Sequence, residues 1–242
     1  DLVDRTGTAG PMPLNGRHVG HPMTLLVSRS AAPRPTGASR PALIPSPLVT
    51  RILVVRHGQS EWNADGRWQG QENPPLTALG RRQAHHAAAA VGAVDALYAS
   101  PLDRAATTAL LISDSIGVGP VVLVPGLMER HAGEWQGLTR DQIEDAYPGY
   151  LDAGRRPPGW EDDQHVENRV MAALDEIADA HPDQHVLAVA HAGVIFSIER
   201  ALGAPWERLA NLGGRWLVRD DGRWSAGERV HLLIEETIPA QI

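Results

Sequence analysis

The chain has 242 residues, 43% of them hydrophobic, which is enough to fill the core of one domain or of two small ones. It contains no cysteine, and all 22 of its basic residues are arginines, which excludes thiol and lysine chemistry. Residues 1–50 carry five arginines and two aspartates, so the net charge of −7 leaves −10 on residues 51–242, and such an acidic body argues against a nucleic-acid partner.

The first part of the chain has the composition of an unfolded segment. Residues 1–49 are rich in Pro, Gly, Ser, Ala and Arg without sustained periodicity, so we predict a disordered or non-native leader there, with the native start near Val49. The apolar run at Met23 is too short for a signal peptide, and no 18-residue apolar run predicts a membrane span. We therefore predict one domain over residues 50–242, in a cytoplasmic protein without a membrane partner.

The first strong structural signal is the apolar, β-branched run Ile52–Val55. It predicts a short buried strand, which delivers Arg56 and His57 together at its carboxyl end before Gly58 turns the chain. Open α/β sheets hold their ligand sites at that end of the strands. An arginine and a histidine closing one strand are more often a surface or capping feature, so the pair needs support from elsewhere.

Two later strand-like runs, 96–99 and 121–124, are each followed by a charged candidate. Arg104 follows the first, in a helix predicted to begin with Ser100 as its N-cap. Glu129 follows the second, in a loop that contains glycines. A surface salt bridge is the alternative interpretation of Arg104.

The strongest strand signal, 186–190, ends at His191, and a helix is predicted to begin at Gly193. The other predicted elements are a helix capped by Thr77, a short helix capped by Thr139, a helix over 164–180, a hairpin at Asp221-Gly222 and a strand over 230–234. Four strand-like runs thus end in an arginine-histidine pair, an arginine, a carboxylate and a histidine. The alternative for His191 is a histidine buried in the core.

These four segments, in this order, resemble the histidine phosphatase superfamily, the phosphoglycerate-mutase-like proteins. The matching motifs are Arg56-His57-Gly58 with Asn63, Ser100-Pro101-Leu102-Asp103-Arg104-Ala105, Glu129 followed by Gly133-Glu134-Trp135-Gln136-Gly137, and His191-Ala192-Gly193. The resemblance implies a three-layer α/β/α sandwich with a mostly parallel central sheet. It also implies a phosphomonoester hydrolase that acts through a phosphohistidine on a small phosphorylated metabolite, without a metal or a cofactor.

The chemistry of phosphoryl transfer suits these residue types, because it asks a protein mainly to position the group and to balance its charge. Arg56 and Arg104 supply guanidinium groups for the phosphoryl oxygens, and Asn63 supplies a further hydrogen bond. We also count Gln69 and Gly70, in the loop after the first strand, among the substrate-binding candidates.

The nucleophile must be a neutral imidazole with one free nitrogen, and we assign this role to His57, with its other nitrogen bonded to a backbone carbonyl near Gly58. His191 is expected to donate to the phosphoryl oxygens. Glu129 is expected to protonate the leaving group and then to deprotonate water. Glu134 is the rival carboxylate, and the resemblance favours Glu129.

Two other functions stay open at this stage: a cofactor-dependent phosphoglycerate mutase and a non-catalytic module that binds phosphorylated ligands. The mutases carry a long basic insertion after the general-acid loop, whereas only 61 residues separate Glu129 from His191 here. Two segments depart from the family pattern, at Ala192 and over 158–162. Because the second segment is expected on the substrate-facing side of the pocket, the sequence does not identify the substrate. Trp68, Trp135 and Trp160 are candidates for the pocket wall. A homodimer is also left open.

Overall fold

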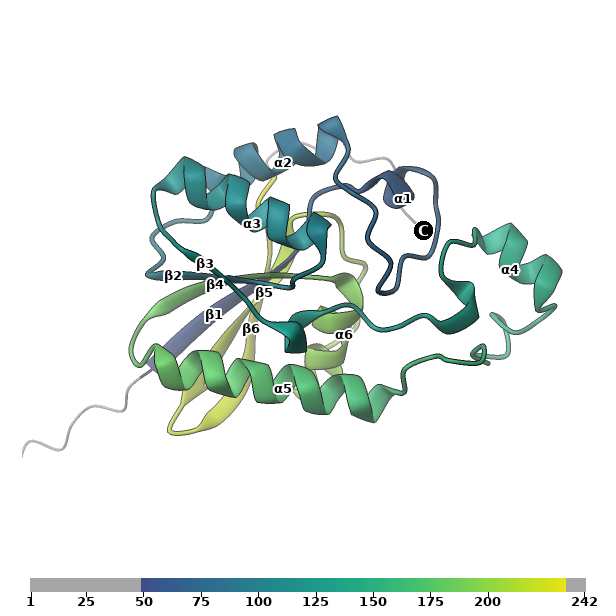
Figure 1. Cartoon of the computed structure of the whole chain (residues 1–242). Helices are drawn as coiled ribbons and strands as arrows, with labels where there is room; N and C mark the ends of the chain where they lie inside the picture. The colour runs from purple at the N-terminus through teal and green to yellow at the C-terminus, as the bar shows by residue number, and fades with distance from the viewer. Residues whose placement is uncertain (1–48, 234–242) are drawn as a thin grey trace, which may run out of the picture. The chain divides into compact units, whose positions relative to one another are not determined.

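The computed structural model describes residues 49–233, so residues 1–48 of the predicted leader and the end of the predicted strand over 230–234 lie outside the described residues, whereas Val49 is the first residue of a strand. One six-stranded sheet has the order β3-β2-β4-β1-β5-β6 (Figure 1). The strands are β1 Val49–Arg56, β2 Ala96–Ala99, β3 Val121–Leu123, β4 His185–Ala190, β5 Gly213–Asp220 and β6 Arg223–His231. The first four are parallel, and the β5-β6 hairpin is antiparallel at one edge. The predicted mostly parallel sheet is confirmed.

Helices cover both faces of this sheet. They are α1 Glu61–Ala64, α2 Ala78–Ala88, α3 Asp103–Ile116, α4 Arg140–Ala146, α5 Asp163–Ala180 and α6 Ala192–Ala201, with 3₁₀ turns η1 Pro125–Leu127 and η2 Gly133–Trp135. The pair α2 and α3 packs on one face and the pair α5 and α6 on the other, whereas α4 lies beyond the carboxyl ends of the parallel strands (Figure 1). The result is a three-layer α/β/α sandwich.

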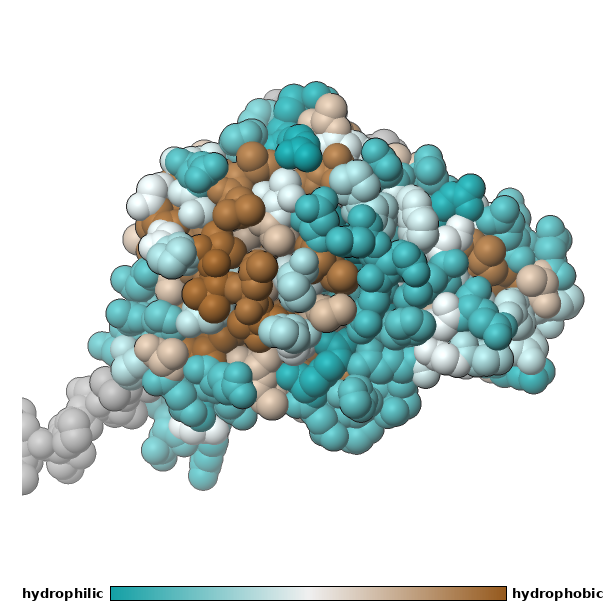
Figure 2. Space-filling model, in the orientation of Figure 1, coloured by the Kyte–Doolittle hydropathy of each residue, from teal (hydrophilic) through white to brown (hydrophobic). Residues whose placement is uncertain are grey.

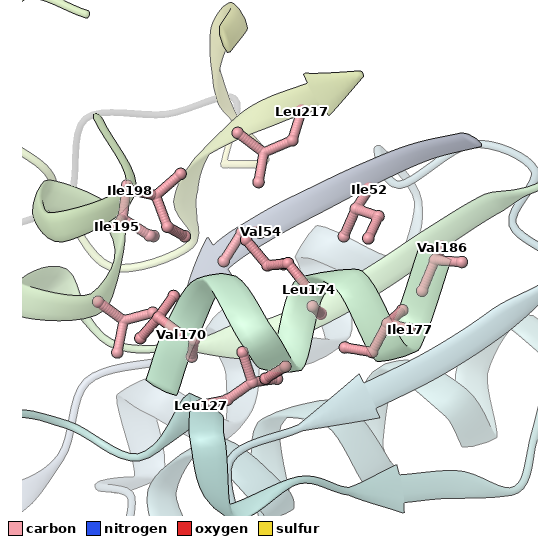
Figure 3. Close-up of a cluster of buried hydrophobic side chains, with 14 of the residues drawn as sticks. Ile52, Val54, Leu127, Val170, Leu174, Ile177, Val186, Ile195, Ile198 and Leu217 are labelled. Carbon is pink, nitrogen blue, oxygen red and sulfur yellow. The ribbon is translucent and has the colours of Figure 1, made fainter. Parts of the chain in front are cut away.

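The central strand β1 is buried on both sides, which explains why its sequence is continuously apolar. Ile52 and Val54 point into the core under α5 and α6 (Figure 3), and Leu53 and Val55 point into the core under α2 and α3. Complete burial of each such side chain contributes roughly 1.5–3 kcal/mol. This two-sided packing fixes the position at which β1 delivers the two residues that follow it.

The local signals placed most elements correctly, and two predictions were wrong. α3 begins at Asp103 with Leu102 as N-cap, two residues later than predicted, and the Ser100 hydroxyl accepts its hydrogen bond from the Leu102 N–H just before the helix. Val230 belongs to β6, which ends at His231, and does not begin a further strand.

The hairpin at Asp221-Gly222 is confirmed, with φ values of 47° and 72° that suit a two-residue turn. The short helix α1 was not predicted; Ser60 and Asn63 form a capping box at its start. Within residues 49–233, no helix is both long enough and apolar enough to cross a membrane.

Candidate active site

A pocket of about 930 Å³ opens at the carboxyl ends of the parallel strands. Seven of the eight predicted site residues line it: Arg56, His57, Asn63, Gln69, Gly70, Arg104 and Glu129. The eighth, His191, is fully buried against the site, with its ring centroid 5.2 Å from that of His57. The structure therefore brings residues from four separate segments to one place.

His57 is held with one nitrogen available for reaction. Its Nδ1 lies 2.6 Å from the Gly58 carbonyl oxygen, and because a carbonyl can only accept, Nδ1 carries the proton. Its Nε2 therefore carries no proton, and the lone pair of Nε2 accepts a hydrogen bond from Arg104 Nε at 3.2 Å. The predicted bond near the Gly58 turn is confirmed. Gly58 itself packs too closely on the Gly80 backbone for a side chain, which keeps the turn tight.

Arg104 is almost completely buried, and the backbone of the loop after α1 fixes its guanidinium. NH1 donates to the Glu72 carbonyl oxygen at 2.7 Å and NH2 to the Gly70 carbonyl oxygen at 2.8 Å. Burial lowers the pKa of Arg104 to about 10, although Glu129 acts to raise it. The group remains charged at neutral pH, so the surface-salt-bridge interpretation of Arg104 is wrong.

Arg56 and Asn63 line the same pocket as His57. Arg56 donates from NH1 to the Leu209 carbonyl oxygen at 2.8 Å, and burial lowers its pKa to about 10. The Asn63 Oδ1 accepts from Ser60 N and from Asn211 Nδ2, each at 3.3 Å, which leaves the Asn63 amide hydrogens to donate to a ligand.

Asn211 is a site residue that the sequence did not reveal. It is buried, and its Nδ2 donates to the His57 carbonyl oxygen at 2.8 Å as well as to Asn63. It therefore ties the loop before β5 to the strand end that carries His57. No motif surrounds Asn211, so no local signal could have identified it.

His191 is both the last residue before α6 and the N-cap of that helix. Its Nε2 lies 2.8 Å from Ser100 Oγ, and Ser100 already accepts a hydrogen bond from Leu102 N. The hydroxyl hydrogen can therefore point at Nε2, an arrangement that leaves the ring proton on Nδ1. That Nδ1 is buried and has no hydrogen-bond partner among residues 49–233. It is the nitrogen available to a ligand.

Glu129 is held by two backbone donors. Oε1 accepts from Arg130 N at 2.8 Å, and Oε2 accepts from Gly193 N at 3.1 Å, at the start of α6. A methyl group on Gly193 would overlap the Glu129 carboxylate, so a larger residue there would displace that carboxylate. The family's other glycine is replaced by Ala192, which lines the pocket.

Arg169 of α5, also not predicted, anchors the loop that carries Glu129. It donates to the Met128 carbonyl oxygen at 2.7 Å and to the Glu129 carbonyl oxygen at 3.2 Å, and it pairs with Glu161 at 2.7 Å. Burial alone would raise the pKa of Glu161, but the hydrogen bonds from Arg169 and His131 N outweigh it and hold that pKa below its usual value. Although the segment 158–162 departs from the family pattern, it retains Glu161, the carboxylate that pairs with Arg169.

The three candidate tryptophans divide between wall and core. Trp68 and Trp160 line the pocket, whereas Trp135 is fully buried and meets both of them edge-on. Glu134 hydrogen-bonds to the Tyr147 hydroxyl and is not among the pocket-lining residues. Its position disfavours it as the proton donor.

The described part of the chain contains no group of three or more histidine, aspartate or glutamate side chains arranged to hold a metal ion. The charge that faces the pocket comes instead from arginine side chains. Phosphate-ester hydrolysis without a metal ion remains a prediction.

Both histidines should make the fold sensitive to acid. Burial lowers the pKa of His57 and of His191 well below 6.5, and the Arg104 guanidinium adds to the effect. As the pH falls below 6.5 the unfolded chain binds protons that the folded chain does not, so stability should decrease there. Thermal unfolding between about pH 7.5 and about pH 5.5 measures this, and a His57→Gln, His191→Gln double variant should show a shallower decrease. An equal slope in wild type and variant would contradict the assignment.

Comparisons with known proteins agree with this geometry. The family model described as histidine phosphatase superfamily (branch 1) matches residues 52–227. A metal-independent phosphoserine phosphatase of Arabidopsis thaliana is 38% identical over 160 residues, covering 62% of this chain and 67% of the relative. A glucosyl-3-phosphoglycerate phosphatase of Mycolicibacterium vanbaalenii is 36% identical over 181 residues, covering 69% of this chain and 80% of the relative.

A solved structure shows the same likeness in three dimensions. The mycobacterial glucosyl-3-phosphoglycerate phosphatase in complex with VO3 matches with a TM-score of 0.64 and 31% identity, over 73% of this chain and 99% of that one. This confirms the fold that the sequence motifs implied. With a matching family model across most of the domain and relatives of this similarity, the chain belongs to the histidine phosphatase superfamily, branch 1.

Proposed function

We propose that the protein is a metal-independent phosphomonoester hydrolase that works through a phosphohistidine intermediate on a small phosphorylated metabolite. One observation carries the proposal: the Gly58 carbonyl fixes the proton of His57 on Nδ1, so that a neutral Nε2 faces the buried guanidinium of Arg104. A neutral ring nitrogen beside cationic forks is what transfer of a phosphoryl dianion requires.

In the first step, His57 Nε2 forms a bond to phosphorus while the bond from phosphorus to the substrate oxygen breaks. Glu129 gives a proton to that oxygen, so the product leaves as an alcohol. In the second step water attacks the phosphohistidine, Glu129 takes a proton from the water, and the bond from phosphorus to Nε2 breaks. The products are inorganic phosphate and the original enzyme.

Four further groups bind and balance the transferred group. Arg56 and Arg104 offset its negative charge, and Asn63 and His191 Nδ1 donate hydrogen bonds to its oxygens. Two relatives are a phosphoserine phosphatase and a glucosyl-3-phosphoglycerate phosphatase, and this supports the phosphatase class. The VO3 complex of the mycobacterial relative is also consistent, because vanadate resembles a phosphoryl group in shape and charge.

We also propose that the protein acts in the cytoplasm, where phosphorylated metabolites occur, with neither nucleic acid nor membrane as partner.

A homodimer also remains a prediction: Leu110, Val122 and Leu123 are exposed apolar side chains, and Figure 2 shows apolar surface over α3 and β3, the elements that carry them. Light scattering would test the dimer.

A phosphate-release screen tests the function. Purified protein should release phosphate from some members of a panel of sugar phosphates, phosphoglycerates, nucleotides and phosphopeptides, and EDTA should leave the rate unchanged because the arginines balance the charge. Adding a bisphosphoglycerate to the phosphoglycerate assay separates a phosphatase from a mutase. No turnover of any phosphomonoester would favour a binding module, and phosphoglycerate isomerisation without phosphate release would favour a mutase.

A further inference from the structure

The pocket has more positive charge than a single phosphoryl group needs. Its lining includes seven arginines but only three carboxylates, in a domain whose net charge is strongly negative. Arg56 and Arg104 are sufficient to offset a phosphoryl dianion at His57. The remaining arginines lie on the rim: Arg67, Arg130, Arg140, Arg156 and Arg200.

Most of these rim arginines are occupied by neighbouring acids. Arg130 and Arg200 both pair with Asp163, at 2.7 and 2.6 Å, and Arg140 lies 3.9 Å from Asp152. Arg67 and Arg156 differ, because neither forms an ion pair with a carboxylate of residues 49–233. Two guanidinium groups therefore remain with charge that no acidic side chain of this region offsets.

Backbone contacts join the segments of the rim that carry these two groups. Arg67 pairs with Thr139 in a short antiparallel bridge, and Ala132 pairs in the same way with Trp160. Next to this bridge, Trp68 N donates to the Leu138 carbonyl oxygen at 2.9 Å, and the Trp68 carbonyl oxygen accepts from Gly137 N at 2.8 Å. Three loops, 66–70, 132–140 and 154–163, are thus joined into one wall.

The side chains of this wall place two aromatic rings next to a cation. The Arg156 guanidinium lies 5.0 Å from the ring centroid of Trp160, and the Trp160 ring lies 5.9 Å from that of Trp68, with the two planes tilted by 59°. A guanidinium held over an indole has its N–H donors at its edge, where they suit a planar or tetrahedral anion. Among residues 49–233, Arg156 donates from NH1 to the Arg155 carbonyl oxygen at 3.2 Å, and its other N–H groups remain for a ligand. Arg67 uses only NH1 for its contacts with Gly137 and Gln142.

We infer that the physiological substrate is a phosphomonoester that carries a second anionic group, bound by Arg156 and Arg67, on a ring-sized body that lies against Trp68 and Trp160. This inference rests on the proposed function, since the phosphoryl group must occupy the site at His57. The cavity volume of about 930 Å³ is near the upper end of the range of roughly 300–1,000 Å³ for ligand pockets, so it has room for such a body. The second anion is a carboxylate or a second phosphate.

Three aryl esters with the same ring test this inference. Para-carboxyphenyl phosphate carries a second anion, para-carbamoylphenyl phosphate is its neutral counterpart, and para-phenylene bisphosphate carries a second phosphate. We expect kcat/KM for one of the two anionic esters to exceed that of the neutral ester by about tenfold, the size of a charge-assisted hydrogen bond. The anionic ester with the higher ratio identifies the second group.

Two neighbouring arginines provide the matched variants. Arg156→Gln should reduce that ratio to about one, and Arg67→Gln should reduce it in the same direction. Arg155→Gln removes the same charge from an exposed residue that stacks on Tyr150 outside the pocket lining, and it should keep the ratio. Equal ratios in wild type and Arg156→Gln, or equal losses in Arg155→Gln, would overturn the inference. Failure of wild type to hydrolyse any of the three esters would instead count against the proposed function.

Discussion

His57→Ala is expected to reduce phosphate release from every substrate by at least about 10³-fold, because His57 Nε2 is the ring nitrogen that offers a lone pair to the phosphoryl site. His191 cannot take its place, since the Ser100 hydroxyl engages its Nε2 lone pair and its Nδ1 carries the proton. The measurement is kcat on an aryl phosphate, together with trapping of acid-labile phosphate on the protein. Wild type should carry the label after a rapid quench, and His57→Ala should carry none.

The control for this experiment is His86→Ala, which removes an exposed histidine of α2. It should keep both activity and labelling. Loss of the bond from His57 Nδ1 to Gly58 should cost about 1 kcal/mol of stability, so a thermal melt of His57→Ala should still show a folded protein. Undiminished turnover by folded His57→Ala would assign the nucleophile to another residue.

Glu129→Gln is expected to affect substrates according to their leaving groups. An alkyl phosphate releases a strongly basic alkoxide that needs a proton, so its kcat should fall by about 10² to 10⁴. Nitrophenyl phosphate releases a weakly basic phenolate, so its first step should be much less affected. The measurement is the ratio of the two rates, with the amount of trapped phosphohistidine showing which step has slowed.

Two variants sharpen this test. Glu134→Gln changes the rival carboxylate, which contacts Tyr147 rather than the pocket, and it should alter neither rate. Gly193→Ala places a methyl group against the Glu129 carboxylate and should reproduce the leaving-group dependence with Glu129 still present. If both substrates slow equally in Glu129→Gln, Glu129 does not act as the acid.

The elements that hold the site could be predicted because their signals are local. The apolar run before Arg56 and the caps at Thr77 and Thr139 each depend on a few adjacent residues, and the structure has all three. The start of α3 was wrong by two residues: the Ser100 hydroxyl accepts a local hydrogen bond from the Leu102 N–H, but that N–H lies before the helix, which begins at Asp103. The contact of Ser100 with His191, 91 residues away, left no local signal.

The sequence by itself determined the family, the sheet and the four segments whose strand ends carry Arg56, His57, Arg104, Glu129 and His191, because parallel strands deliver their last residues to one edge. Only the tertiary structure decided how these side chains are held. Asn211 reaches His57 across 154 residues, and Arg169 reaches the Glu129 loop across 40. The lack of an ion pair for Arg67 and Arg156 within residues 49–233 was equally invisible, because an ion pair depends on which loops meet in space and leaves no periodic pattern along the chain.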